Sequence, residues 1–246
     1  MDQIERLNAI KKYIFTNKKV RTLEIASKFN ISEQTVRKDF NILEEKNYIR
    51  RVHGGAVSKS TFNERLNINI DVKKKLCERA ASYVHYRNTI YIDGGTSYYH
   101  LIDFIPDDYN ISIITPSLPI ALRVMETSSH SVYLLGGKVD GTTLETTTTI
   151  DNSLIKDIYF DIIFLGVSGF SKDFAFTEDN IHTLNIKRKV CSQSLKKIMV
   201  ATSDKQNKIA FKKSFDTSDI DVFITEQNIN DEVKKYLDKK LNLVLI

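Results

Sequence analysis

The residues best suited to chemistry are glycines, hydroxyl side chains and a lysine, each placed after a short apolar run. Gly94 and Gly95 precede Thr96 and Ser97, and two glycines in a turn let the backbone approach an anion closely. Any one of these turns is typical of an ordinary tight turn, but the set together favours binding of a phosphate group. The residues predicted to contact such a ligand are Asp93, Gly94, Gly95, Thr96, Ser97, Thr115, Ser117, Gly136, Gly137 and Lys205.

Catalysis and metal binding find less support in the same turns. Asp93 is the only carboxylate beside the first glycine turn, and it is predicted to organise that turn by accepting backbone N–H bonds. Asp39, inside a predicted helix, is expected to pair with a basic neighbour. The five histidines show neither paired spacing nor cysteine companions, so no metal site and no cofactor is expected. No glycine loop followed by Lys-Ser or Lys-Thr is present, which argues against an ATPase or kinase.

A second group of polar residues, in segment 33–45, suits nucleic acid. Val36, Phe40 and Leu43 form one apolar face of a predicted helix, with Ser32 as its N-cap. The other face is polar and basic, and arginine can bind guanine, an amide can bind adenine, and lysine or threonine can bind phosphate oxygens. Alone, such a face is as often ordinary solvated surface. The residues predicted to contact DNA are Ser32, Gln34, Thr35, Arg37, Lys38, Asn41, Arg50, Arg51 and His53.

The neighbouring segments favour DNA binding because they complete a winged helix-turn-helix domain. Residues 2–16 have the spacing of an amphipathic helix, and residues 22–29 predict a short second helix capped by Thr22. Two residues separate that helix from the third, as in a helix-turn-helix. Residues 48–57, with two arginines and a glycine pair, predict a β-ribbon or wing.

The distribution of charge supports the same division. Residues 1–60 hold 13 lysines and arginines against 7 acidic residues, whereas residues 61–246 hold 23 against 24. The whole excess of positive charge therefore lies on the predicted DNA-binding segment, as a polyanionic partner requires. No apolar stretch approaches the length of about 20 residues that spans a bilayer, so no membrane partner is expected. The N-terminus lacks signal-peptide features and two cysteines suggest no disulfide framework, so the expected compartment is cytoplasmic.

The second part of the chain predicts an α/β domain. Residues 64–86 are expected to form one long helix, in which the lysine run 73–75 is typical of a solvated face. Beyond residue 88, apolar strands alternate with helices, which predicts a mostly parallel, Rossmann-like sheet covered on both faces. The predicted strands are 89–93, 111–115, 132–135, 162–166, 198–202, 222–225 and 243–246, and the predicted helices are 98–104, 118–126, 152–158, 180–196 and 231–240. The threonine run 146–149 is expected to be an exposed strand or loop. The predicted parts are a DNA-binding domain (1–57), a linker (58–63) and an effector domain (64–246).

Two segments in the first part resemble the DeoR family of bacterial transcriptional regulators. They are Thr35–Phe40 (Thr-Val-Arg-Lys-Asp-Phe) and Arg51–Ala56 (Arg-Val-His-Gly-Gly-Ala), at a characteristic separation. The resemblance implies a second domain of the sugar isomerase and CoA-transferase type that senses phosphorylated sugars or related metabolites. Family patterns fall on residues 93–97, on 115–117, on Gly136-Gly137 and on Lys205, so the similarity covers nearly the whole chain.

The chain departs from the family pattern near the expected effector pocket. Pro116 stands where the family usually has asparagine, and Ala175-Phe176-Thr177 where it has Gly-Leu-Thr. Thr183-Leu184 replaces a common Glu-Ala pair, and a family glycine around Thr147 is missing. These departures leave open which sugar is sensed, and whether sensing is retained.

The leading prediction is a sequence-specific regulator, a repressor of carbohydrate genes that releases double-stranded operator DNA when a phosphorylated sugar binds; activation in place of repression stays open. No enzyme activity is expected under this prediction. A homo-oligomer, dimer or tetramer, is expected because helix-turn-helix proteins usually read two half-sites. One alternative is that residues 64–246 are a working sugar-phosphate isomerase or transferase. Another is an architectural DNA binder with a vestigial second domain.

Overall fold

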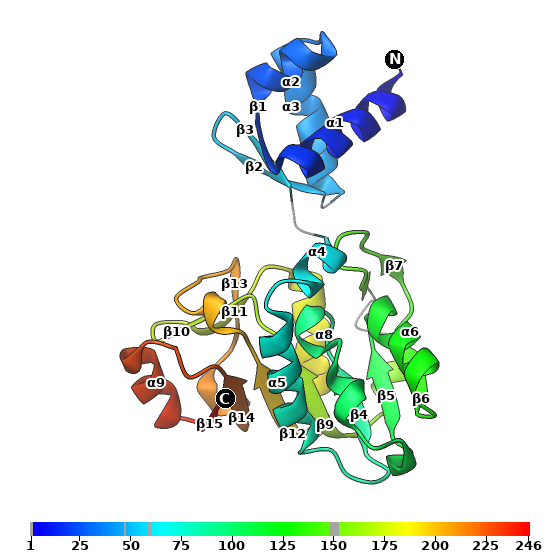
Figure 1. Ribbon diagram of the computed structural model, residues 1–246, viewed down its shortest axis with the longest axis vertical. Coiled ribbons are helices and arrows are strands. Elements are labelled where there is room, and N and C mark those ends of the chain that lie inside the picture. The colour runs from blue at the N-terminus through cyan, green and yellow to red at the C-terminus, as the bar shows by residue number, and fades with distance from the viewer. Residues whose placement is uncertain (1, 47, 59–60, 148–152) are drawn as a thin grey trace. The chain divides into compact units, whose positions relative to one another are not determined.

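The computed structural model describes residues 2–46, 48–58, 61–147 and 153–246. The chain divides into two compact units, drawn in Figure 1. The first comprises Met1–Glu64 with Asp140–Thr143, and the second comprises Arg65–Val139 with Leu144–Ile246. Within the described residues, no helix has the length and apolar character needed to cross a membrane.

The first unit is a winged helix-turn-helix, as predicted. Its elements are α1 (Gln3–Asn17), β1 (Lys19–Arg21), α2 (Thr22–Phe29), α3 (Glu33–Glu45), β2 (Ile49–Val52) and β3 (Gly55–Ser58). The three strands form an antiparallel sheet in the order β1-β3-β2. Ile10 and Ile14 of α1, Ile25 of α2 and Val36 and Phe40 of α3 pack together in its core. The prediction that Thr22 caps α2 is wrong: Arg21 holds the cap position, and Thr22 is a buried residue of the first turn.

Backbone conformation and close packing explain why the wing has two adjacent glycines. Gly54 has φ of +73°, a left-handed conformation that favours glycine. A Cβ added to Gly55 would lie 2.0 Å from the carbonyl oxygen of Val20, because β1 approaches β3 closely at that point. The wing therefore closes onto β1 only with glycine at position 55.

The single long helix predicted for residues 64–86 is wrong. The chain forms α4 (Phe62–Leu66) and then α5 (Ile70–Ala81). Asn69 between them has φ of +53°, in the left-handed region, where a right-handed helix cannot continue. Of the predicted linker, residues 59 and 60 lie outside the described residues, while Ser58 belongs to β3 and Phe62 begins α4.

All seven predicted strands form one parallel sheet in the second unit. Its order is β15-β14-β12-β9-β4-β5-β6, and every neighbouring pair runs parallel. The strands are β4 (Thr89–Ile92), β5 (Ser112–Thr115), β6 (Ser131–Leu134), β9 (Phe160–Leu165), β12 (Ser194–Val200), β14 (Val222–Thr225) and β15 (Asn242–Leu245). The inner strands could be predicted from the sequence because a strand buried on both faces is a nearly continuous apolar run. The edge strands β6 and β15 are less buried.

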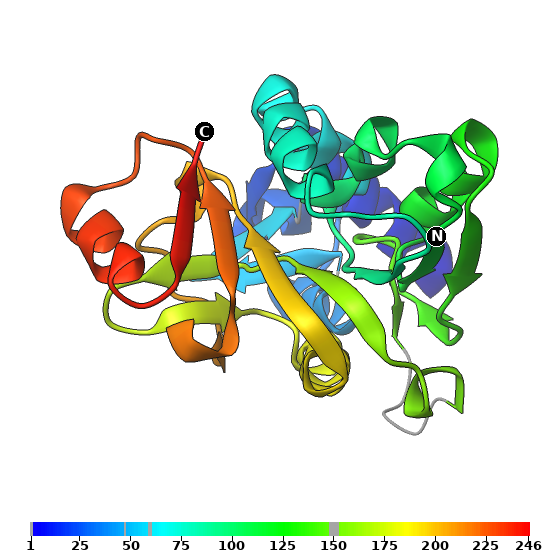
Figure 2. The same cartoon turned by 90° about the horizontal axis from the view of Figure 1, so that it is seen from below.

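Helices cover both faces of this sheet. Ile90 and Ile92 of β4 point into a core shared with α5 and α6 (Leu118–Thr127). Tyr91 points into the opposite core, shared with α8 (Ile181–Ser192) and α9 (Asp231–Asp238). Figure 2 shows α5 and α8 on opposite sides of the strands.

Several shorter elements differ from the prediction. The segment predicted as helix 98–104 forms two 3-10 turns, η1 (Thr96–Tyr98) and η2 (Leu101–Phe104), and the helix predicted over 180–196 ends at Ser192, where β12 takes over two residues later. The remaining 3-10 turns are η3 (Asp107–Tyr109), η4 (Ser203–Lys205) and η5 (Thr217–Asp219). A second sheet of β10 (Gly169–Ser171), β11 (Ala175–Glu178) and β13 (Lys212–Phe215), and a pair of β7 (Lys138–Val139) with β8 (Thr146–Thr147), were not predicted.

Two other predictions reach beyond the described residues. Helix α7 spans Ser153–Lys156, and Asn152 of the predicted 152–158 helix lies outside the described part. Thr146 lies in a strand, as one of the expected alternatives had it, but it is buried, not exposed. Thr148 and Thr149 lie outside the described part.

Candidate DNA-binding surface and effector pocket

The polar face of α3 is open to solvent. Ser32 caps the helix, accepting the backbone N–H of Thr35 at 3.1 Å. Gln34, Arg37, Lys38 and Asn41 are exposed, and Thr35 is half-buried. The opposite face packs Val36, Phe40 and Leu43 into the core. The helix therefore presents donors and cations outward while its apolar residues fix its orientation.

The wing is tied to α3 through Arg51. Its backbone N–H donates to Glu44 at 2.7 Å, and its guanidinium Nη1 donates to the side-chain oxygen of Asn41 at 2.5 Å. Arg51 and Asn41 thus hold each other, which gives them a positioning role besides any contact with DNA. Arg50 and His53 are exposed on the wing.

Asp39 pairs with a basic neighbour, as expected. Its carboxylate takes a two-pronged contact from Arg6, with Nε at 2.7 Å and Nη2 at 3.0 Å. The Asp39 side chain is 1% exposed and that of Arg6 is 17% exposed. The pair joins α1 to α3, so Asp39 belongs to the scaffold and not to the DNA-contacting surface.

In the second unit, the carboxyl ends of β4 and β9 meet around a buried ion cluster. Lys187 of α8 lies with its Nζ 2.8 Å from Asp93 and 2.5 Å from Glu178, and it also donates to the carbonyl of Gly166 at 2.9 Å. Asp93 accepts the backbone N–H of Gly166 at 2.9 Å. The prediction that Asp93 accepts a backbone N–H is confirmed, although the donor, Gly166, follows β9 and does not belong to the glycine turn after β4.

The expectation that Asp93 has no second acid beside it is wrong. Glu178, at the end of β11, shares Lys187 with it, and Glu145 packs its side chain directly against Gly94. These residues come from elements 50 or more positions along the chain, so sequence neighbourhood gave no signal of them. A lysine or glutamate on an otherwise apolar helix or strand face was the available clue, since such a residue is rarely buried without a partner.

The predicted hydroxyl residues are enclosed at the same sheet edge. Thr115 accepts the backbone N–H of Ser117 at 3.1 Å, and Ser117 caps α6 by accepting the N–H of Ile120 at 3.4 Å. Thr96 and Ser97 are buried in η1. Gly136 and Gly137, by contrast, are exposed after edge strand β6, with open space where a Cβ on Gly136 would stand.

Two lysines form the basic side of this edge. Lys73 of α5 is 5% exposed and donates to the carbonyls of Arg65 and Leu66. Lys205 is half-buried and donates to the carbonyl of Val167 at 2.8 Å. In the described part of the chain, neither ammonium forms an ion pair with a carboxylate. The interpretation of the whole run 73–75 as solvated is therefore wrong for Lys73, which the first turns of α5 direct into the protein.

Burial lowers the pKa of both lysines, and nearby charges act on each. The pKa of Lys73 is lowered to about 8, chiefly by loss of hydration and next by the positive charge of Lys205. Loss of hydration also lowers the pKa of Lys205. The two ammonium groups donate to backbone carbonyls, and the carboxylates of Glu178 and Asp204 act on Lys205 only at longer range. An anion bound beside both lysines would give each of them a direct ion pair.

A cavity of about 10 Å³ lies beside Asp93, room for about one water molecule. It is lined by Tyr91, Asp93, Pro116, Thr146, Thr147, Thr183 and Ile186. Three of the departures from the family pattern (Pro116, Thr147 and Thr183) therefore meet at one point. The fourth lies elsewhere: Ala175 and Phe176 belong to the apolar core.

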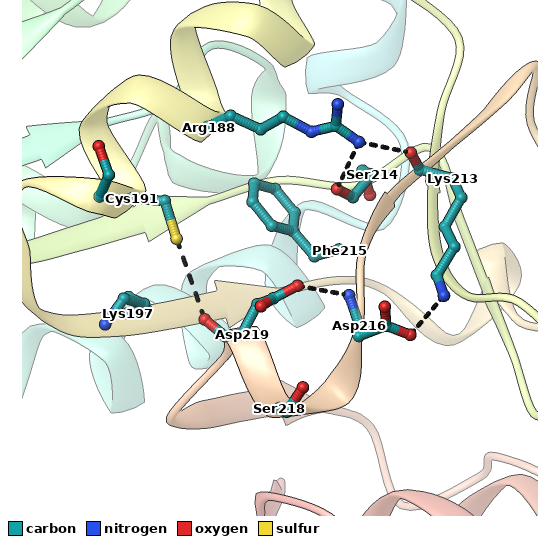
Figure 3. Close-up of a pocket in the computed structure, with 10 residues that line it drawn as sticks. Arg188, Cys191, Lys197, Lys213, Ser214, Phe215, Asp216, Ser218 and Asp219 are labelled. Atoms are coloured by element: carbon teal, nitrogen blue, oxygen red, sulfur yellow. Dashed lines mark hydrogen bonds and ion pairs between the residues drawn. The ribbon is translucent and has the colours of Figure 1, made fainter.

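A larger hollow of about 550 Å³ lies where α8 and β13 pass η5 (Figure 3). Figure 3 shows two of its cations bonded within the protein: Arg188 donates to the carbonyls of Lys213 and Ser214, and Lys213 pairs with Asp216. The hollow contains none of the predicted site residues.

Comparison with known proteins gives matches over both units. Residues 6–62 match the DeoR-like helix-turn-helix domain, and residues 68–227 match the DeoR C terminal sensor domain. The HTH-type transcriptional regulator GolR of Listeria innocua is 28% identical, over 98% of both chains. A lactose phosphotransferase system repressor of Staphylococcus epidermidis is 30% identical, over 93% of this chain and 94% of the repressor. Ribose 5-phosphate isomerase from Plasmodium falciparum superposes with a TM-score of 0.40 at 17% identity, covering 55% of this chain and 52% of the isomerase; that likeness carries no argument about function.

Proposed function

The chain belongs to the DeoR family of transcriptional regulators, and from that membership we propose that it is a repressor of carbohydrate genes. In this proposal it binds double-stranded operator DNA and releases it when a phosphorylated sugar or related metabolite occupies the second unit. The proposal includes a homo-oligomer, because a helix-turn-helix protein usually reads two half-sites.

The DNA-contacting surface is proposed to be the outward face of α3 with the wing. Gln34, Arg37 and Lys38 project from the exposed face, where Gln and Arg suit base edges and Lys suits phosphate. Arg50 and His53 lie exposed on the wing, within reach of the flanking backbone in this kind of docking. Arg51 and Asn41 hold the wing to the helix.

One observation carries the proposal of a phosphorylated effector: the pair Lys73 and Lys205, two neighbouring cations without a carboxylate partner among the described residues. Their ammonium groups suit a phosphate, which offers several strong acceptors to more than one donor. The glycine turn at Gly94-Gly95 and the hydroxyls of Thr96 and Ser97 would complete the site. Gly136 and Gly137 would contact the ligand only at its outer margin, since they are exposed.

Release of DNA requires that the effector bind two conformations of the protein with different affinity. The cavity beside Asp93 holds about 10 Å³ in this structure, so a sugar phosphate must widen it on entry. That widening supplies the difference between the two conformations. A coupling of about 1–3 kcal/mol between effector and operator would be ordinary for such a regulator.

A second function, isomerisation of a sugar phosphate, is favoured by one observation. Glu145 is buried at the proposed ligand site with its pKa raised to about 8 by burial and by the charge of Asp93, and a carboxylate titrating near neutral pH can act as a base. The relatives are named as regulators, and we propose that this chain does not catalyse. Turnover of an aldose or ketose phosphate by the purified protein would contradict that choice.

The DNA-binding proposal is tested with Arg37→Ala and the matched control Lys46→Ala, an exposed cation at the C-terminal end of the same helix. Operator fragments from upstream of the gene serve as probes in a gel-shift titration with excess nonspecific DNA. Arg37→Ala is expected to lose specific binding, with effector-unit melting unchanged, while the control keeps it. Full operator affinity in Arg37→Ala would defeat the assignment of α3.

A further inference from the structure

Three buried carboxyl groups lie at the proposed effector site, and two of them pair with the ammonium group of Lys187. Asp93, Glu145 and Glu178 are 3%, 9% and 8% exposed. Lys187 lies within ion-pair distance of Asp93 and Glu178. The cluster therefore has more acid than base when all three carboxyls are ionised.

Glu145 is the carboxyl left over. Asp93 is satisfied by Lys187 and by the N–H of Gly166. Glu178 is satisfied by Lys187, by the hydroxyl of Ser168 at 2.5 Å and by a backbone N–H at 3.0 Å. Within the described residues, the Glu145 carboxyl has no ion pair and no hydrogen bond. Burial and the neighbouring carboxylates raise its pKa to about 8, as expected for a buried acid without a partner.

The position of Glu145 places it on the path of a ligand. A Cβ added to Gly94 would lie 2.1 Å from its Cδ and 2.3 Å from its Oε1, so the carboxyl rests on the glycine turn. Its strand segment is fixed, since Leu118 donates to the carbonyl of Leu144 at 3.0 Å and Thr146 donates to that of Pro116 at 2.8 Å. A ligand atom that approaches Gly94 must meet this carboxyl.

The basic side of the site and its acidic side thus each have a charged group without a direct counterion. Among the described residues, Lys73 and Lys205 have no direct ion pair with a carboxylate, and the Glu145 carboxyl accepts no hydrogen bond. A hydroxyl group of the ligand could donate one hydrogen bond to Glu145, but it would not compensate the excess negative charge of the carboxylates. An ammonium group supplies both the bond and the charge, and charge-assisted hydrogen bonds are about twice as strong as neutral ones.

On the basis of the function proposed above, we propose that Glu145 makes the pocket selective for an amino-sugar phosphate, with the sugar's ammonium group on Glu145 and its phosphate on Lys73 and Lys205. Asp93 and Glu178, already paired with Lys187, would add long-range attraction for the ammonium group. The ligand class is thereby narrower than a phosphorylated sugar in general.

The test uses titration calorimetry of the full chain with two matched pairs: glucosamine 6-phosphate against glucose 6-phosphate, and galactosamine 6-phosphate against galactose 6-phosphate. We expect the amino sugar of at least one pair to bind at least about tenfold more tightly, the size of one hydrogen bond to a charged group. Glu145→Gln, nearly isosteric, should reduce that ratio to near one. Glu126→Gln, an exposed glutamate of α6, is the control and should keep the preference.

Each contrary outcome is distinct. Equal binding within both pairs overturns the selectivity and leaves the proposed function standing. A preference that survives in Glu145→Gln, with that variant folded by its circular dichroism and its melting temperature, also overturns the role of Glu145. Failure of all four sugar phosphates to bind the wild-type chain overturns the proposed function as well.

Discussion

Replacing Lys73 by methionine removes one of the two cations proposed to hold the effector's phosphate. Methionine keeps the length and apolar stem of the buried side chain while deleting its charge. The pKa of Lys73 falls from 10.5 to about 8 in the folded chain, which corresponds to about 3 kcal/mol of lost hydration and repulsion. A bound anion would offset this cost, and an offset of the whole amount corresponds to roughly 100-fold in affinity.

A lower limit comes from the bond itself. One hydrogen bond to a charged group contributes about 1.5–3 kcal/mol, so at least about tenfold should be lost. The assay is calorimetric titration with inorganic phosphate, repeated with glucose 6-phosphate. We therefore expect Lys73→Met to lower the affinity for inorganic phosphate and for glucose 6-phosphate by about 10- to 100-fold.

The matched control is Lys74→Met, the exposed neighbour in the same lysine run. It should change affinity less than twofold at moderate salt, because exposed charges are screened. An affinity of Lys73→Met within threefold of the wild type, or an equal loss in the control, would refute the reasoning that Lys73 is an anion-binding group.

Three further predictions concern stability. Between about pH 8 and 10.5 the unfolded chain binds more protons at Lys73 than the folded chain does, so unfolding free energy should rise across that window by up to about 3 kcal/mol; a rise unchanged in Lys73→Met would contradict this source. Asp39→Asn should cost about 3 kcal/mol in urea unfolding of the first unit, since it leaves Arg6 without its partner, and a cost under 1 kcal/mol would show that the pair is dispensable. Gly55→Ala should cost about 1–3 kcal/mol by overpacking against Val20 and should weaken operator binding; wild-type melting would disprove the close-approach argument.

The sequence predicted what short-range pattern determines. The seven strands of the parallel sheet were found because each is an apolar run of the right length, and the winged helix-turn-helix because its three helices and wing are local units. The pattern failed at residues 64–86, where apolar spacing continues through Asn69 although its backbone turns left-handed. It also missed β10, β11 and β13, which are short strands in an antiparallel sheet of their own.

The effector site was predicted only in its glycine and hydroxyl parts. Those residues follow strand ends and are readable in order, whereas the ion cluster joins Asp93 to Lys187 across 94 positions. Lys73 stood in a run of three lysines, and only the packing of α5 decides which of them turns inward. The departure at Ala175 also affects the backbone. Ala175 has φ of +52°, a conformation in which the family's usual glycine meets no steric penalty.

The central claim is tested most directly by measuring binding of the purified chain to DNA from upstream of its own gene, by fluorescence anisotropy, with and without a panel of phosphorylated sugars. Salt is varied, since each phosphate contact lowers the logarithm of affinity by about 0.9 per decade of salt. The account predicts sequence-specific binding that one phosphorylated sugar reverses. Specific binding that no phosphorylated sugar changes, or the absence of specific binding, would contradict it.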